Sequence, residues 1–82
     1  AALRAEPFAL VVANLLRTEL LPLVDRIARA TARGGRAVLS GLLDSERDEV
    51  LRALARVGLE ARGARTARDP GGDVWLSLLT QR

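Results

Sequence analysis

The feature that most constrains the fold is a short apolar segment, residues 8–16 (FALVVANLL), interrupted by one polar residue, Asn14. A run this short and apolar is typical of a strand covered on both faces, as in a parallel sheet. A polar amide at the carboxyl end of such a strand lies where open α/β sheets bind their ligands. We therefore predict a strand over residues 8–14 and take Asn14 as a candidate site residue. The alternative is that Asn14 is a plain turn residue at a strand end.

The same pattern recurs at residues 36–43 (RAVLSGLL), which predicts a second strand with Ser40 and Gly41 near its end. Ser40 and Gly41 are therefore weaker candidates for the same ligand cleft. The alternative for this pair is simple packing, because small residues are also common where a strand ends.

A helix is predicted between these two strands. Pro22 is tolerated only in the first turn, so the helix should begin near Thr18 or Leu21. Residues 34–35 are both glycine, which should end this helix in the left-handed cap conformation. We therefore interpret residues 33–36 (RGGR) as a turn and not as part of an RNA-binding Arg/Gly segment.

The second half of the chain predicts one more helix and two strands. Asp44 and Ser45 can cap the helix. Residues 59–67 and 74–79 follow as strands, and the composition of residues 69–73 (DPGGD) indicates a turn between them. The predicted order is β-α-β-α-β-β, an α/β fold that ends in an antiparallel hairpin.

Composition limits both the core and the chemistry. The 82 residues suffice for one small domain, and the core must come from Leu, Val, Ala and Ile, because there is one Phe, one Trp and no Tyr or Met. Cysteine and histidine are absent, which excludes thiol catalysis and the commonest general base. A net charge of +3 with evenly spread arginines argues against a nucleic-acid surface. No signal peptide or membrane span is visible, so we expect a cytoplasmic protein and no membrane partner.

Two further groups of residues have simpler interpretations than a site. The carboxylates Asp44, Glu46 and Asp48 could suggest a carboxylate site, but acidic side chains are also favoured at a helix N-terminus. Trp75 is expected in the core, because Trp is a large apolar filler. No metal site is predicted.

Three segments carry a resemblance to a known family: residues 11–16 (VVANLL), 33–43 (RGGRAVLSGLL) and 46–50 (ERDEV). In this order and spacing they resemble the C-terminal half of bacterial ribosomal protein L11 methyltransferases. Nearly the whole chain is covered. The resemblance implies a Rossmann-like S-adenosylmethionine-dependent methyltransferase, of which residues 1–82 would be a single partial domain holding strands four to seven.

The resemblance also implies a site and a reaction. Asn14 corresponds to the Asn at the end of strand four, beside the methyl group of the cofactor, where its amide would orient a substrate amine. Ser40 and Gly41 would be weaker cofactor contacts. The implied function is N-methylation of lysine or other amino groups of a ribosomal protein, with S-adenosylmethionine as the cofactor of the intact parent.

The resemblance covers only part of such an enzyme. Its Gly-rich loop after strand one and its acidic residue after strand two have no counterpart here, so we expect a fragment that does not bind the cofactor alone and is inactive alone. The strand at residues 8–14 would also lack its neighbour, which predicts self-association through an exposed sheet edge. Two alternatives remain: a non-catalytic α/β interaction module, and a methyltransferase that acts on another protein or on RNA.

Overall fold

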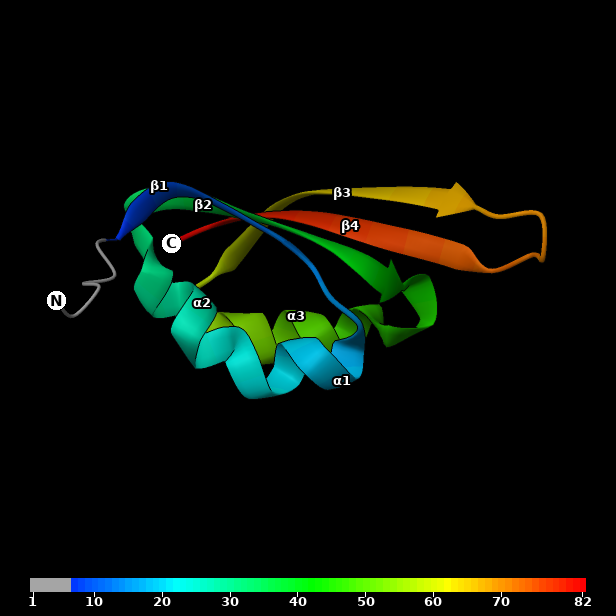
Figure 1. The fold of residues 1–82 in the computed structure, drawn as a ribbon, viewed down its shortest axis with the longest axis horizontal. Coiled ribbons are helices and arrows are strands. Elements are labelled where there is room, and N and C mark those ends of the chain that lie inside the picture. The colour runs from blue at the N-terminus through cyan, green and yellow to red at the C-terminus, as the bar shows by residue number, and fades with distance from the viewer. Residues whose placement is uncertain (1–6) are drawn as a thin grey trace, which may run out of the picture.

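The computed structural model describes residues 7–82 as a four-stranded sheet with helices along one face (Figure 1). The prediction of an α/β fold is confirmed. The elements follow in the order β1 (Phe8–Asn14), α1 (Arg17–Leu20), η1 (Leu21–Leu23), α2 (Val24–Ala30), β2 (Thr31–Leu43), η2 (Asp44–Glu46), α3 (Arg47–Arg56), β3 (Glu60–Arg68) and β4 (Val74–Gln81), where η marks a short 3-10 helix.

The sheet has the strand order β1-β2-β4-β3. β1 and β2 are parallel, whereas β4 runs antiparallel to both β2 and β3. The last strand therefore inserts between β2 and β3, and the predicted terminal hairpin of β3 and β4 is confirmed. This arrangement leaves β1 at one edge of the sheet and β3 at the other.

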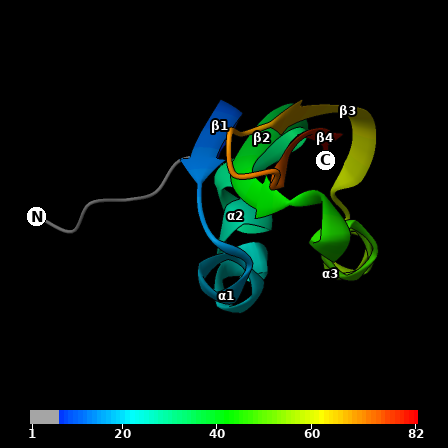
Figure 2. The same cartoon turned by 90° about the vertical axis from the view of Figure 1, so that its right-hand side faces the viewer.

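The core lies between the sheet and the helices, which all pack on the same face (Figures 1 and 2). In α3, Val50 and Leu54 are fully buried while Arg52 and Arg56 are exposed, as expected for an amphipathic surface helix. As predicted, the buried apolar residues are all Leu, Val, Ala or Ile. They are Leu20, Ile27, Ala28, Ala37, Leu39, Leu42, Val50, Leu54, Leu59, Leu76 and Leu78.

The predicted end of the first helix, at the glycine pair 34–35, is wrong. Helix α2 ends at Ala30, and β2 begins at Thr31, five residues before the predicted start of the strand. The Oγ1 hydroxyl of Thr31 donates a 2.8 Å hydrogen bond to the carbonyl of Ile27, so Thr31 closes the last turn and is itself already extended.

The glycine pair belongs to the sheet instead of to a turn. Gly34 N–H donates to the carbonyl of Arg82, and Arg82 N–H donates to the carbonyl of Gly35, both at 3.0 Å. A Cβ on Gly35 would lie 3.0 Å from the carbonyl oxygen of Ala9 and 3.1 Å from that of Phe8. Gly35 therefore allows β2 to approach β1 closely, and residues 33–36 are part of the strand and not a turn.

The face of the sheet opposite the helices carries no helix within residues 7–82, and it is partly apolar. Phe8, Leu10 and Val12 alternate along β1 and are 55%, 59% and 67% exposed. Val12 pairs with Val38, which pairs with Leu79, so an apolar row crosses the sheet. We call this surface the open face.

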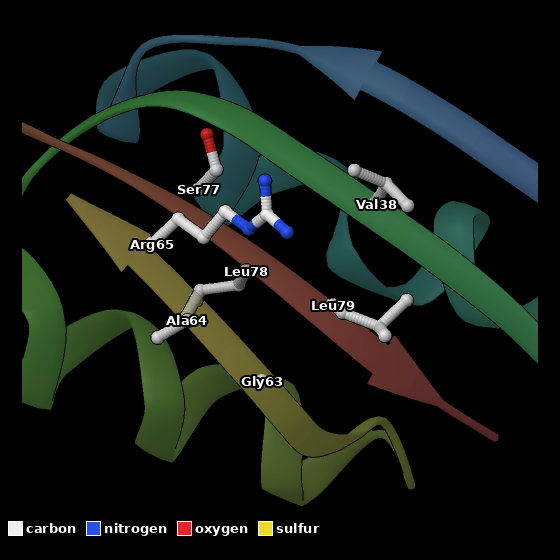
Figure 3. A pocket seen from close by; sticks show the side chains of 7 residues that line it. All are labelled: Val38, Gly63, Ala64, Arg65, Ser77, Leu78 and Leu79. Atoms are coloured by element: carbon white, nitrogen blue, oxygen red, sulfur yellow. The ribbon is translucent and has the colours of Figure 1, made fainter. Parts of the chain in front are cut away.

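A shallow hollow of about 410 Å³ lies on the open face over β2, β4 and β3. Figure 3 shows the Arg65 side chain extending from β3 across β4 within this hollow. Its lining residues are Val38, Gly63, Ala64, Arg65, Ser77, Leu78 and Leu79. None of the predicted site residues Asn14, Ser40 and Gly41 lines this hollow, although Val38 precedes Ser40 by only two residues in β2.

Candidate functional site

The three predicted site residues lie together at the carboxyl ends of the two parallel strands. Asn14 is the register partner of Ser40, and Gly41 follows directly. Leu15 N–H donates a 2.9 Å hydrogen bond to the carbonyl of Ser40, which continues the ladder one residue beyond β1. Asn14 is exposed, while Ser40 and Gly41 are half-buried. The structure therefore brings the three residues together at the carboxyl ends of β1 and β2, where Asn14 is exposed to solvent.

Gly41 adopts a backbone conformation that favours glycine, with φ at +84°. The pairing of β2 with β4 is irregular between Leu39 and Leu42, so Gly41 lies in a bulge. A Cβ built on Gly41 would overlap Oδ1 of Asn14. The bulge thus places a residue without a side chain next to the Asn14 amide.

A second hollow, of about 190 Å³, opens beside Gly41, which is one of its lining residues. It contains apolar walls, one aromatic ring and one carboxylate, and it is bounded by segments that follow β1 and β2. Its lining residues are Leu16, Arg17, Thr18, Gly41, Leu43, Glu46 and Trp75. We call this hollow the strand-end pocket.

Arg17 joins the two segments that border the strand-end pocket. Its Nε donates to Glu46 at 2.9 Å, and its Nη1 donates to Glu49 at 2.7 Å. The hydrogen bond to the Glu49 side chain and then that to Glu46 raise the pKa of Arg17 above its ordinary value. Arg17 is 37% exposed, so solvent screening keeps its energetic contribution modest, and its effect is mainly geometric. Sequence reasoning missed this cross-link, because its partners are 29 and 32 residues away.

The acidic residues at the start of α3 satisfy local backbone groups and arginines. Glu46 Oε1 accepts a 2.9 Å hydrogen bond from Leu43 N–H, and Asp44 Oδ1 accepts from Arg47 at 2.7 Å. Glu46 thus reaches back to the residue before the 3-10 helix. The prediction that Asp44 or Ser45 caps the helix is wrong, because the N-cap positions of η2 and α3 are Leu43 and Glu46 and neither has a side-chain cap hydrogen bond. Within residues 7–82, no group of three or more His, Cys, Asp or Glu side chains is placed to hold a metal ion.

The expectation that Trp75 lies in the core is wrong. Trp75 is half-buried, pairs with Leu43 and lines the strand-end pocket. Its indole Nε1 donates a 2.8 Å hydrogen bond to Oδ2 of Asp69, in the turn of the hairpin. Only the pairing of β4 with β2 brings Trp75 to this site, so no local sequence signal could have revealed it.

The bond between Asp69 and Trp75 predicts a pH-dependent change in indole fluorescence. The Trp75 N–H, and to a smaller extent the backbone N–H of Asp73, hold the pKa of Asp69 below its ordinary value. Because the folded-state pKa is lowered, this stabilisation is present above the unfolded-state pKa and is lost as the pH falls through the folded-state pKa. We expect the emission of Trp75, the single Trp, to change with a midpoint below that of an ordinary aspartate.

The isosteric variant Asp69→Asn is the control for this titration. It keeps an oxygen that can accept the indole N–H but has no carboxyl group to protonate. Its emission should lack the acid transition. A midpoint in the unchanged chain at or above the usual aspartate pKa would contradict the prediction.

In the part of the chain that the structure describes, no helix is long and apolar enough to cross a membrane.

Comparison with known proteins identifies the family. The family described as ribosomal protein L11 methyltransferase (PrmA) matches residues 1–81. A ribosomal protein L11 methyltransferase of Mesorhizobium japonicum is 40% identical over 75 residues, which cover 92% of this chain and 24% of that protein. One of Brucella suis is 47% identical over 53 residues, or 65% of this chain and 19% of that protein. The chain therefore spans about a fifth to a quarter of the length of these curated relatives.

Solved structures agree with this result. A ribosomal protein L11 methylase from Lactobacillus delbrueckii subsp. bulgaricus matches with a TM-score of 0.74 and 25% identity, over 93% of this chain and 37% of that one. The N-methyltransferase NodS from Bradyrhizobium japonicum WM9 matches with a TM-score of 0.66 and 18% identity, over 99% of this chain and 55% of that one, and shows likeness of fold. The fold is that of a Rossmann-like methyltransferase. With a family match over almost its whole length, the chain belongs to the ribosomal protein L11 methyltransferase family.

Proposed function

We propose that this chain is the C-terminal part of an S-adenosylmethionine-dependent N-methyltransferase that acts on lysine or other amino groups of a ribosomal protein. The observation that carries the proposal is the accessible Asn14 amide at the carboxyl end of β1, beside Ser40 and Gly41. Family membership supports the reaction class, and the names of the relatives support the substrate. A ribosomal protein substrate is also consistent with action in the cytoplasm.

The residues at the strand ends suit methyl transfer to an amine. The Asn14 amide oxygen can accept a hydrogen bond from the amine N–H and so direct the nitrogen lone pair. S-adenosylmethionine would supply an electrophilic methyl group and leave as its thioether, while the amine nitrogen gains the methyl group and loses a proton to water. Alignment contributes most to such a step. A chain without His or Cys can therefore provide what the reaction needs.

The chain supplies only one side of a cofactor site. Asn14, with weaker contributions from Ser40 and Gly41, would border the methyl end of S-adenosylmethionine. The glycine pair 34–35 lies within β2 and hydrogen-bonds to Arg82. It therefore cannot serve as the Gly-rich cofactor-binding loop that joins a strand to a helix. The rest of the cofactor would need residues from outside this chain.

The residues that would complete the cofactor site would dock on the edge of β1 and on the open face. Within residues 7–82, β1 has a partner strand on one side only and the open face is partly apolar, and the chain spans only a fifth to a quarter of its relatives. We infer that an N-terminal part with the Gly-rich loop pairs with β1 and covers the open face. Under this proposal, residues 1–82 are one partial domain.

A chimera tests the proposal. Residues 1–82 replace the matched 75-residue segment of the Mesorhizobium relative, and the intact relative is the positive control. We expect calorimetry to detect S-adenosylmethionine binding by the chimera but not by residues 1–82 alone. We also expect the chimera to transfer a labelled methyl group to ribosomal protein L11.

Several outcomes would contradict the proposal. Micromolar binding of S-adenosylmethionine by residues 1–82 alone would show that this chain needs no further part for the cofactor. A chimera that does not fold, or that folds without binding the cofactor, would reject the inferred docking. A chimera that binds the cofactor and methylates RNA or another protein, but not ribosomal protein L11, would favour the alternative substrate class. A chimera that binds the cofactor and methylates nothing would favour a non-catalytic interaction module.

A further inference from the structure

Gly41 leaves the space that the Asn14 amide occupies. A Cβ added to Gly41 would overlap Asn14 Oδ1 and would lie 3.2 Å from the carbonyl oxygen of Leu15. Gly41 follows Ser40, which is the register partner of Asn14, so Gly41 lies one residue beyond the position opposite Asn14 on the neighbouring strand. Any side chain at position 41 would therefore compete with the amide for the same volume.

We propose that Gly41 is a positioning residue for methyl transfer, because its missing side chain lets the Asn14 amide lie against the backbone of β2. This inference rests on the proposed function of Asn14. The overlapped atom is the far end of a side chain that can rotate. A methyl group at position 41 would thus be accommodated by turning the amide away, while the Leu15 backbone atoms at 3.2 and 3.3 Å would need to shift by only a few tenths of an ångström.

The expected consequence is a loss of alignment more than a loss of folding. Methyl transfer depends on the position of the amine nitrogen, and a misplacement of about 1 Å can lower a rate about 100-fold. Gly41→Ala should therefore lower kcat strongly. It should change the affinity for S-adenosylmethionine only slightly, since most contacts to the cofactor would come from outside this chain.

Gly58 provides a matched control within the same chain. It has nearly the same left-handed backbone, with φ at +82° against +84° for Gly41, and a Cβ added there meets nothing within 4 Å. Gly58 ends α3 and is exposed, and it does not line the strand-end pocket. Alanine at either position carries the same kind of backbone penalty. The difference between the two variants therefore reports the contacts of a Cβ at position 41 with Asn14 and with the Leu15 backbone, and the Asn14→Ala background separates these two contributions.

The test compares Gly41→Ala and Gly58→Ala in the chimera, with kinetics and amide NMR. We expect Gly41→Ala to lower kcat about 100-fold and to shift the side-chain NH₂ signals of Asn14, which are assigned by their loss in Asn14→Ala. Gly58→Ala should leave kcat within a few-fold and the signals in place. In an Asn14→Ala background, adding Gly41→Ala should lower kcat no further, because both changes remove the same oriented amide.

Failure of this inference differs from failure of the proposed function. Equal losses of kcat in Gly41→Ala and Gly58→Ala, or unmoved Asn14 signals in Gly41→Ala, would overturn the positioning role while leaving a role of Asn14 intact. Shifted Asn14 signals with unchanged kcat in Gly41→Ala would overturn both the positioning role of Gly41 and the role of Asn14 in methyl transfer. If Gly41→Ala alone does not fold, the double variant Asn14→Ala/Gly41→Ala should fold, because the overlapped atom is gone. An unfolded double variant would also overturn the inference.

Discussion

Replacing Asn14 by Ala in the chimera should lower methyl transfer to ribosomal protein L11 by roughly 30- to 1000-fold, or about 2–4 kcal/mol in the activation free energy. The amide is exposed at the strand ends, and its expected hydrogen bond to the substrate amine strengthens only when the nitrogen is aligned for attack. Affinity for S-adenosylmethionine should stay within a few-fold. Single-turnover kinetics with labelled cofactor, together with calorimetry, would measure both quantities.

The control for this experiment is Thr66→Ala, on the exposed strand β3 of the hairpin. Thr66 is also polar and exposed, but it does not line the strand-end pocket. Near-normal turnover by Asn14→Ala would remove Asn14 from the mechanism. A parallel fall in turnover and cofactor affinity would instead assign Asn14 to cofactor binding.

The isolated chain, residues 1–82, should self-associate through the edge of β1. No charged residue occurs from residue 8 to residue 16, and Leu10 and Val12 are largely exposed. An edge strand of this kind leaves backbone N–H and C=O groups unpaired, and such edges recruit another strand. Sedimentation at micromolar concentrations should therefore show dimers or larger species, and the chimera should be monomeric because its N-terminal part covers the edge.

A charge placed on β1 should prevent this association. We expect Val12→Lys to shift the isolated chain to monomer, because two copies could then pair only by bringing like charges together or burying them. The matched control is Thr66→Lys on β3, the opposite edge, which already carries Arg62, Arg65 and Arg68. The control should associate as the unchanged chain does. A monomeric unchanged chain with cooperative unfolding would show that the edge is protected in another way.

The contrast between the two edges shows how far sequence reasoning reaches. The apolar run of β1 and the arginine-rich β3 are both local patterns, so the two strands could be predicted from the sequence. The expectation that β1 has an exposed edge came instead from the family resemblance, and its self-association stays a prediction. The hairpin could be predicted as well, because residues 69–73 consist only of Asp, Pro and Gly, which are common in turns. The same holds for Asn14, Ser40 and Gly41 as residues at strand ends, since parallel strands bring their carboxyl ends to one edge.

The end of the first helix could not be predicted in this way. The glycine pair 34–35 carries a strong helix-ending signal, yet the helix ends at Ala30. Residues 31–35 gain hydrogen bonds from Arg82, and Thr31 is fully buried beside β1. Those partners are distant in the sequence, so pairing within the sheet overrode the local preference.

The sequence by itself determined the α/β class, the order of the elements, the composition of the core and three residues of the candidate site, because each depends on a periodicity or a turn within a few neighbouring residues. Only the tertiary structure decided that Trp75 borders that site, that Arg17 links the segments after β1 and β2 through Glu46, and that Gly41 leaves room for the Asn14 amide. These relations join residues that are 27 to 61 positions apart along the chain. The position of Trp75 arises from the insertion of β4 beside β2, whereas the other two relations arise from the parallel pairing of β1 with β2 and from the bulge at Gly41. No local pattern encodes these pairings.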